Sequence, residues 1–74
     1  LQEGRAEPAL HVADRQLAAS PEHADAWHLR GLALMQLGRL PEALSSIDQA
    51  LHLTPGVSFY HQNRAEVLVL MGRA

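Results

Sequence analysis

The sequence contains no cysteine, so neither a disulfide framework nor a thiolate metal site is available to it. The net charge at pH 7 is only -2 and the basic residues are scattered, which argues against a nucleic-acid-binding surface. Lysine is also absent and all six basic residues are arginine, a composition that we associate with GC-rich bacterial genomes. The longest apolar run, residues 67–71, is too short to cross a bilayer.

The chain is nevertheless apolar enough to form a core. Hydrophobic residues make up 47% of its 74 residues, which is too large a share for a disordered tail, and this length allows one small domain. Neither end resembles a signal peptide, and the chain does not begin with methionine, so we expect a piece of a longer protein. The sequence names no compartment, and a soluble cytoplasmic protein is the expectation.

A period of 34 residues runs through the whole chain. Gly-Arg pairs begin at positions 4, 38 and 72, and the prolines at positions 21 and 55 stand in the same register. Further matches in this register are Ala9-Leu10 with Ala43-Leu44, Asp14 with Asp48, Leu17 with Leu51, Arg30 with Arg64, and Leu34 with Leu68. A fixed period of this kind indicates an array of stacked structural repeats.

The segment from Trp27 to Pro55 resembles one complete tetratricopeptide repeat, whose signature is Trp, Leu-Gly, Tyr, Ala, Phe and Pro at fixed intervals. The matching positions hold Trp27, Arg30-Gly31, Leu34, Ala43, Ile47 and Pro55. The resemblance implies an all-α fold, a right-handed α-solenoid of antiparallel helix pairs with about four helices. It divides the single domain, residues 1–74, into 1–23 (the end of a first repeat, mainly helix B), 24–57 (a complete repeat) and 58–74 (helix A of a third repeat).

Proline and glycine positions set the expected helix boundaries within this frame. Helices are expected at residues 7–19, 24–37, 41–53 and 58–71, with residues 1–3 as the tail of a preceding helix A. Pro8 and Pro41 fall in first turns, where a missing N–H costs nothing, and Ser58 is expected as an N-cap. A left-handed residue is expected to end each helix A at Gly4, Gly38 and Gly72. The B helices are expected to stop at Ser20-Pro21 and Thr54-Pro55.

The apolar pattern predicts how these helices pack. The helix at 24–37 is apolar almost all the way round, so we expect both of its sides to be covered. The resemblance implies that Trp27 is largely buried against the preceding helix B. It also implies that Gly31 lets another helix approach closely. The helix at 41–53 has one wet face and forms an outer layer.

The polar residues do not combine into a recognisable catalytic or metal site. The histidines show no pair three or four apart on one helix with a helpful carboxylate, whereas zinc takes three or four ligands. Solvated side chains are therefore expected for His11, His23, His28, His52 and His61. The serines lack a glycine-flanked elbow and the carboxylates are dispersed. We expect no metal, no cofactor and no enzymatic activity.

In arrays of this family the A helices line a concave groove that holds a partner peptide. Carrying that pattern over gives Asp25, His28, Leu29, Leu32, Met35 and Gln36 on one helix A, and Phe59, Gln62, Asn63, Glu66, Val69 and Leu70 on the next. Leu32, Met35 and Phe59 would then anchor the peptide. Spacing alone does not separate this role from packing in the core, and the core alternative stays open for each apolar residue.

Two departures from the family narrow the groove's chemistry. Family members that clamp the carboxylate-ended tails of chaperones use a Lys and Asn set, and here Asn63 has no lysine beside it. Such a clamp is therefore not expected. Arg30 and Arg64 replace the leucine usual before the small residue, and their aliphatic stems can cover apolar surface while the guanidinium reaches water or a carboxylate.

The resulting expectation is a non-catalytic scaffold that binds a protein or peptide partner. An alternative is an appendage that regulates or presents substrates to an enzyme domain elsewhere in a longer chain. A third expectation is self-association, because apolar faces at both ends lack a covering helix. The residues expected to carry it are Leu10, Leu17, Leu68, Leu70 and Met71. No nucleic-acid or membrane partner is expected.

Overall fold

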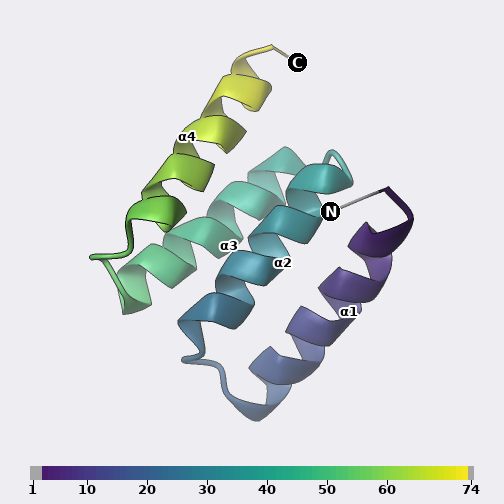
Figure 1. Cartoon of the computed structure of the whole chain (residues 1–74), viewed down its shortest axis with the longest axis vertical. Helices are drawn as coiled ribbons and strands as arrows, with labels where there is room; N and C mark the ends of the chain where they lie inside the picture. Colours follow the sequence, from purple (N-terminus) through teal and green to yellow (C-terminus); the bar gives the residue numbers. More distant parts are fainter. Residues whose placement is uncertain (1–2, 74) are drawn as a thin grey trace.

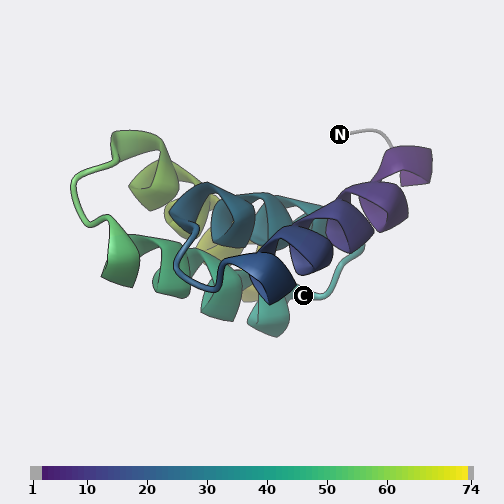
Figure 2. The ribbon, with the colours of Figure 1, turned by 90° about the horizontal axis from the view of Figure 1, so that it is seen from below.

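The computed structural model describes residues 3–73 as four α-helices: α1 (Glu3–Ala19), α2 (Ala24–Gln36), α3 (Leu40–Leu53) and α4 (Ser58–Gly72). They lie side by side in chain order, each antiparallel to the one before (Figure 1). α2 packs against α1 and α3, and α3 packs against α4. The N-terminal ends of α2 and α4 lie on the same side of α3 (Figure 2), where the two helices touch narrowly. The predicted all-α fold of four helices in antiparallel pairs is confirmed.

The turn between α2 and α3 follows the predicted stereochemistry. Gly38 has a φ of 77°, a left-handed conformation that L side chains rarely adopt, and this confirms the prediction for this residue. The N–H of Arg39 bonds to the carbonyl of Leu34 at 2.9 Å, and the N–H of Gly38 to that of Met35 at 3.1 Å. These two bonds form a Schellman motif, which satisfies carbonyls that the end of α2 would otherwise leave unpaired.

The glycine prediction is wrong at the other two positions. Gly4 lies inside α1, Gly72 is the last residue of α4, and neither has a positive φ. Glycine permits a left-handed turn but does not impose one. At Gly38 the turn allows α3 to fold back on α2, whereas Gly4 belongs to α1 and the helix runs on through it.

The start of α1 is consequently different from the expectation. Residues 1 and 2, most of the expected helix tail, lie outside the described part of the chain, and Glu3 is part of α1, which continues through Gly4. Pro8 therefore stands inside the helix rather than in its first turn. Its missing N–H leaves the Gly4 carbonyl without a helical partner. Both residues are exposed, so water can satisfy that carbonyl.

The other predicted helix ends and starts agree with the structure, except for the N-cap at Ser58. α1 ends at Ala19 before Ser20-Pro21, α3 ends at Leu53 before Thr54-Pro55, and Pro41 stands in the first turn of α3. Ser58, however, is the first residue of α4, and the N-cap is Val57, with no side-chain cap bond. His23, which stands 34 positions before Val57, does cap its helix, since its Nδ1 accepts a hydrogen bond from the N–H of Ala26 at 3.2 Å.

The core lies where α2, α3 and α4 meet. Leu34, Ala43, Ile47 and Val67 are fully buried there and form one cluster. Gly31 is buried beside them, and a Cβ on it would stand 2.5 Å from Cγ1 of Ile47. The predicted close approach of helices at Gly31 is therefore confirmed.

Trp27 is largely but not completely buried, in agreement with the prediction. Its indole N–H donates to the carbonyl of Pro21 at 2.8 Å. That bond holds one edge of the ring against the loop after α1, so the side chain does not enter the space between the helices completely. His61, 34 residues later, makes the same contact to the carbonyl of Pro55 at 2.9 Å. A ring N–H bonded to the preceding proline carbonyl is thus a repeated feature of the two helices.

Candidate partner-binding surface

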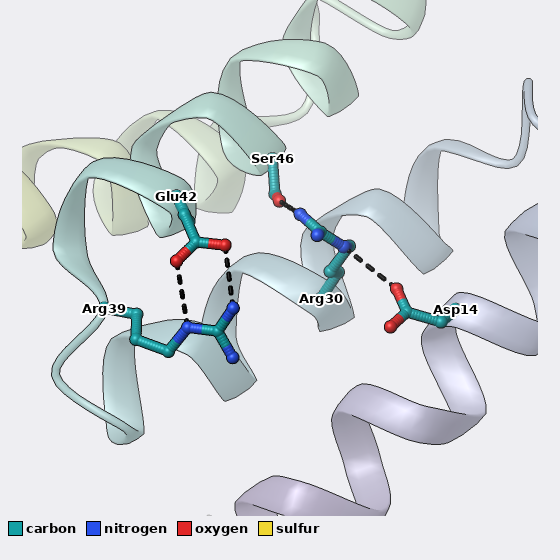
Figure 3. Close-up of polar contacts among 5 residues, drawn as sticks. All are labelled: Asp14, Arg30, Arg39, Glu42 and Ser46. Carbon is teal, nitrogen blue, oxygen red and sulfur yellow. Dashed lines mark hydrogen bonds and ion pairs between the residues drawn. The ribbon is translucent and has the colours of Figure 1, made fainter.

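Arg30 bridges three helices. From α2, its Nε donates to Asp14 of α1 at 2.9 Å, and its Nη1 donates to the hydroxyl of Ser46 in α3 at 2.6 Å (Figure 3). Ser46 is a buried polar residue, and this bond satisfies it. A surface pair between Arg39 and Glu42, shown in the same view, closes the α2–α3 turn and lowers the pKa of the Glu42 carboxyl through its hydrogen bonds.

The bridge recurs one repeat later. Arg64 of α4 donates to Asp48 of α3 at 2.5 Å, and both residues stand 34 positions after Arg30 and Asp14. The arginines of α2 and α4 are therefore both turned toward the helix that precedes them. Of the two partners expected for each guanidinium, water or a carboxylate, the structure shows a carboxylate in both cases.

The N-terminal halves of α2 and α4 are joined by two polar contacts. The buried hydroxyl of Tyr60 donates to the carboxylate of Asp25, and Nε2 of His28 donates to Oδ1 of Asn63 at 2.7 Å. Burial, the hydrogen bond to Asp25 and the charge of Asp25 together raise the pKa of Tyr60 to about 12. The phenol is consequently neutral and able to donate throughout the physiological range.

A cluster of three aromatic rings stands at the same place. The centroid of His28 lies 4.7 Å from that of Tyr60 and 5.2 Å from that of Phe59, and the Phe59 and Tyr60 centroids are 5.1 Å apart. Edge-on and tilted contacts at these distances are attractive. Within the cluster Tyr60 is buried but Phe59 is 51% exposed, so the cluster holds a large apolar side chain at the surface.

The residues predicted for the groove divide into two groups. The exposed ones are Asp25, Gln36, Phe59, Gln62, Glu66 and Val69. The half-buried ones are His28, Leu29, Leu32, Met35, Asn63 and Leu70. The contacts bring His28, Phe59 and Asn63 together, with Glu66 linked to Asn63 at 3.4 Å. Met35 packs against the core cluster instead, and Gln36 lies at the opposite end of α2.

The residues predicted for self-association are also unequal in exposure. Leu68 is 43% exposed, whereas Leu10, Leu17, Leu70 and Met71 are half-buried. Leu10 and Met71 already pack against the core cluster of their own chain. Val12 on α1, which the sequence interpretation did not single out, is 47% exposed.

The pairs that join the helices were missed as pairs. Asp14 and Asp48 match in the 34-residue register, as do Arg30 and Arg64, and the separation between acid and base is 16 residues in both repeats. Two opposite charges that recur together at a constant separation were a signal of contact. Ser46 and Tyr60 gave no such signal, because neither Val12 nor Ala26, the residues 34 positions earlier, has a hydroxyl.

Residues 3–73 contain no group of three or more His, Asp or Glu side chains placed to hold a metal ion. No helix among them combines the length and the apolar character needed to cross a bilayer.

Comparison with known proteins gives one result. The family profile described as tetratricopeptide repeat matches residues 1–58, which is more than half of the chain. α4 lies almost wholly beyond the matched part, although the 34-residue register continues through it. No curated protein and no solved structure matches the chain significantly.

Proposed function

The chain belongs to the tetratricopeptide repeat family, and from this premise we propose that it binds a peptide segment of a partner protein across the adjoining faces of α2 and α4. Members of this family are typically non-catalytic and generally act in protein–protein interaction. The proposal adds the place and the chemistry of binding. Its centre is the aromatic cluster of His28, Phe59 and Tyr60.

The observation that carries the proposal is the exposure of Phe59. Half of this side chain faces solvent although two other rings hold it in position. A large aromatic residue that is already ordered loses little freedom when a partner covers it, which is a property of binding hot spots. The groups beside it can bond a peptide backbone, since Gln62 is exposed and Asn63 is half-buried.

Charge favours a partner with basic side chains. The charged residues of α2 are Asp25 and Arg30, and those of α4 are Arg64 and Glu66. Because both arginines are paired with aspartates of α1 and α3, the carboxylates of Asp25 and Glu66 remain as the charges nearest the cluster. An arginine or lysine of the partner would meet these carboxylates and the face of Phe59.

The proposal is tested by selecting ligands without prior choice. A random dodecapeptide phage library is panned on the immobilised chain, and enriched peptides are synthesised and titrated calorimetrically. We expect enriched sequences that combine an aromatic or aliphatic residue with arginine or lysine. Amide shifts of the labelled chain should then change most around residues 28 and 59–66.

Two matched pairs of variants sharpen the test. Phe59→Ala should weaken binding by about tenfold or more, the loss expected for an aromatic anchor, whereas His52→Ala on the exposed face of α3 should not. Glu66→Gln should reduce the salt dependence of binding, and Glu7→Gln on α1 should leave it unchanged. Equal affinity of the Phe59→Ala variant, or shift changes confined to α1 and α3, would contradict the proposal.

A further inference from the structure

A second surface is independent of the proposed peptide-binding face and lies on α1. A shallow, open and largely apolar pocket is lined there by Val12, Arg15, Gln16 and Ala19. All four side chains are exposed and follow helical spacing, so they form one stripe along the helix. We call this stripe the open face of α1. No described helix covers it, because α1 packs only against α2 and uses another side for that contact.

The internal repeat identifies what kind of element fits the open face of α1. The residues 34 positions later on α3 are Ser46, Gln49, Ala50 and Leu53, and each of them is buried or half-buried. α3 turns this stripe toward α2, since Ser46 accepts a hydrogen bond from Arg30. The open face of α1 is therefore the surface that, one repeat later, holds a helix of the α2 type.

α4 also has a surface that no described helix covers. It stands in the same register as α2, but Leu68 is 43% exposed whereas Leu34, its counterpart on α2, is fully buried. Ala65 is likewise exposed, and its counterpart Gly31 is buried against α3. We call Ala65 and Leu68 the open face of α4. The corresponding surface of α2, one repeat earlier, packs against α3. α1 stands in the same 34-residue register as α3 and is therefore a helix of the same type.

We propose that α4 of one copy docks on α1 of a second copy, in the relation that α2 has to α3 within the chain. The two open faces then cover each other, and the alternation of helix types continues across the junction. Such a contact joins two different faces, so it is heterologous and adds copies head to tail rather than closing a symmetric dimer.

Side-chain sizes at the junction support this pairing. Within the chain, Gly31 admits Ile47, whose side chain would meet any added Cβ. The register places Ala65 opposite Ala13 at the junction, so two alanines stand where Gly31 and Ile47 meet within the chain: the residue on α4 is larger than its counterpart and the residue on α1 is smaller. Val12 stands at the place of Ser46 and offers an apolar surface to Leu68 and to the stem of Arg64. The charged residues at the junction are Arg64 of α4, which pairs with Asp48 of its own chain, and the exposed Arg15 of α1.

The test uses two variants that each block one face. Leu68→Glu closes the open face of α4, and Val12→Glu closes that of α1; both sites are exposed, so the chain's own core is untouched. Sedimentation velocity of the unsubstituted 74-residue chain should show an average mass that rises from micromolar to millimolar concentration and passes that of a dimer. Each variant alone should stay monomeric. An equimolar mixture should form a one-to-one dimer and stop there, because each variant still supplies one functional face.

The control is Ala18→Glu, an exposed substitution on α1 outside its open face, which should associate like the unsubstituted chain. Circular dichroism establishes that every variant keeps its helices. A monomeric unsubstituted chain at millimolar concentration would overturn the proposal and leave both faces to flanking helices of a longer chain. A mixture that stays monomeric, or a single variant that still associates, would equally overturn it. None of these outcomes depends on peptide binding at Phe59.

Discussion

At the scale of single residues, the two central glycines have different reasons to be glycine. Gly31 is buried in α2 with a helical backbone, and its neighbours leave no space for a side chain. Gly38 has open space around it, and it is the backbone conformation that excludes other residues. Substitutions can therefore separate steric from conformational requirements.

Gly31→Ala is expected to destabilise the fold by up to about 2 kcal/mol, since overpacking usually costs about 1–3 kcal/mol and the gain in helix propensity offsets about 1 kcal/mol of it. The added Cβ would stand 2.5 Å from Ile47 Cγ1 and 3.2 Å from the Ala43 carbonyl, and the cost outweighs the gain of about 1 kcal/mol in helix propensity. The matched control is Gly4→Ala in α1, where nothing lies within 4 Å and a gain in stability is expected. Urea unfolding of both variants measures the difference, and changes of the same sign would refute the packing argument.

Gly38→Val is expected to cost more stability than Gly38→Asn, because asparagine visits the left-handed region more readily than a β-branched residue. A residue at a φ of 77° pays roughly 1–2 kcal/mol for this conformation. Gly72→Val serves as the control, since Gly72 is exposed without a positive φ. Thermal melts that rank Gly38→Val with Gly72→Val would remove the conformational explanation.

Tyr60 is expected to make stability fall at alkaline pH. Its pKa is raised from 10.0 to about 12 in the fold, so the unfolded chain loses its phenol proton first. The full contribution is present below a pH of about 10 and is lost as the pH rises to about 12, at a cost of about 2–3 kcal/mol. Urea titrations across that window measure it. The variant Tyr60→Phe should lack this pH dependence, and an identical dependence in both proteins would contradict the assignment.

At the scale of helices, the Arg30 bridge distinguishes two apparently equivalent contacts. Arg30 and Arg64 each pair with an aspartate of the preceding helix, but only Arg30 also satisfies a buried hydroxyl, that of Ser46. The ion pairs are partly exposed and each contributes at most about 1 kcal/mol. Leaving Ser46 unpaired adds a further cost of about 1–3 kcal/mol.

Arg30→Met is therefore expected to destabilise the chain more than Arg64→Met, and the excess should disappear in an Arg30→Met, Ser46→Ala double variant. Methionine keeps an apolar stem of similar length, so the comparison isolates the polar contacts. Urea unfolding at low and high salt provides the measurement, since the ion-pair part weakens with salt and the Ser46 part does not. Equal losses for the two single variants would show that the Ser46 bond contributes nothing.

At the scale of the whole molecule, α2 and α3 each have a helix on two sides, whereas α1 and α4 contact the rest mainly on one. In a stack of this kind stability is the sum of nearest-neighbour contacts, so the outer helices open more easily than the inner ones. The exposure of Leu68 and Val12 is the same asymmetry seen in single side chains.

Native-state hydrogen exchange is expected to show the slowest amides in α2 and α3, with faster exchange in α1 and α4. At high protein concentration the head-to-tail contact should slow exchange in α1 and α4 selectively, because those are the helices that the junction covers. The Val12→Glu and Leu68→Glu variants, measured alone, should show no such concentration dependence. Uniform protection of all four helices at low concentration would contradict the nearest-neighbour account.

The sequence by itself determined the number of helices, most of their ends and the turn at Gly38. These features follow from local constraints that are written into the residue types: a proline that cannot continue a helix, a glycine that accepts a positive φ, and an apolar stripe with helical spacing. The 34-residue period then identified the family, because each repeat offers its neighbour the same surface.

Only the tertiary structure decided which of these periodic features are realised. Gly4 continues a helix whereas Gly38 follows the end of one, and Leu68 is exposed where Leu34 is buried. The exposure of Phe59 and the joining of Arg30 to Asp14 and Ser46 were likewise invisible before the helices were placed together. The physical reason is that a repeated sequence encodes the same surface in each repeat. Whether a side chain on that surface is buried, or finds a hydrogen-bond partner, depends on whether a neighbouring helix packs against it.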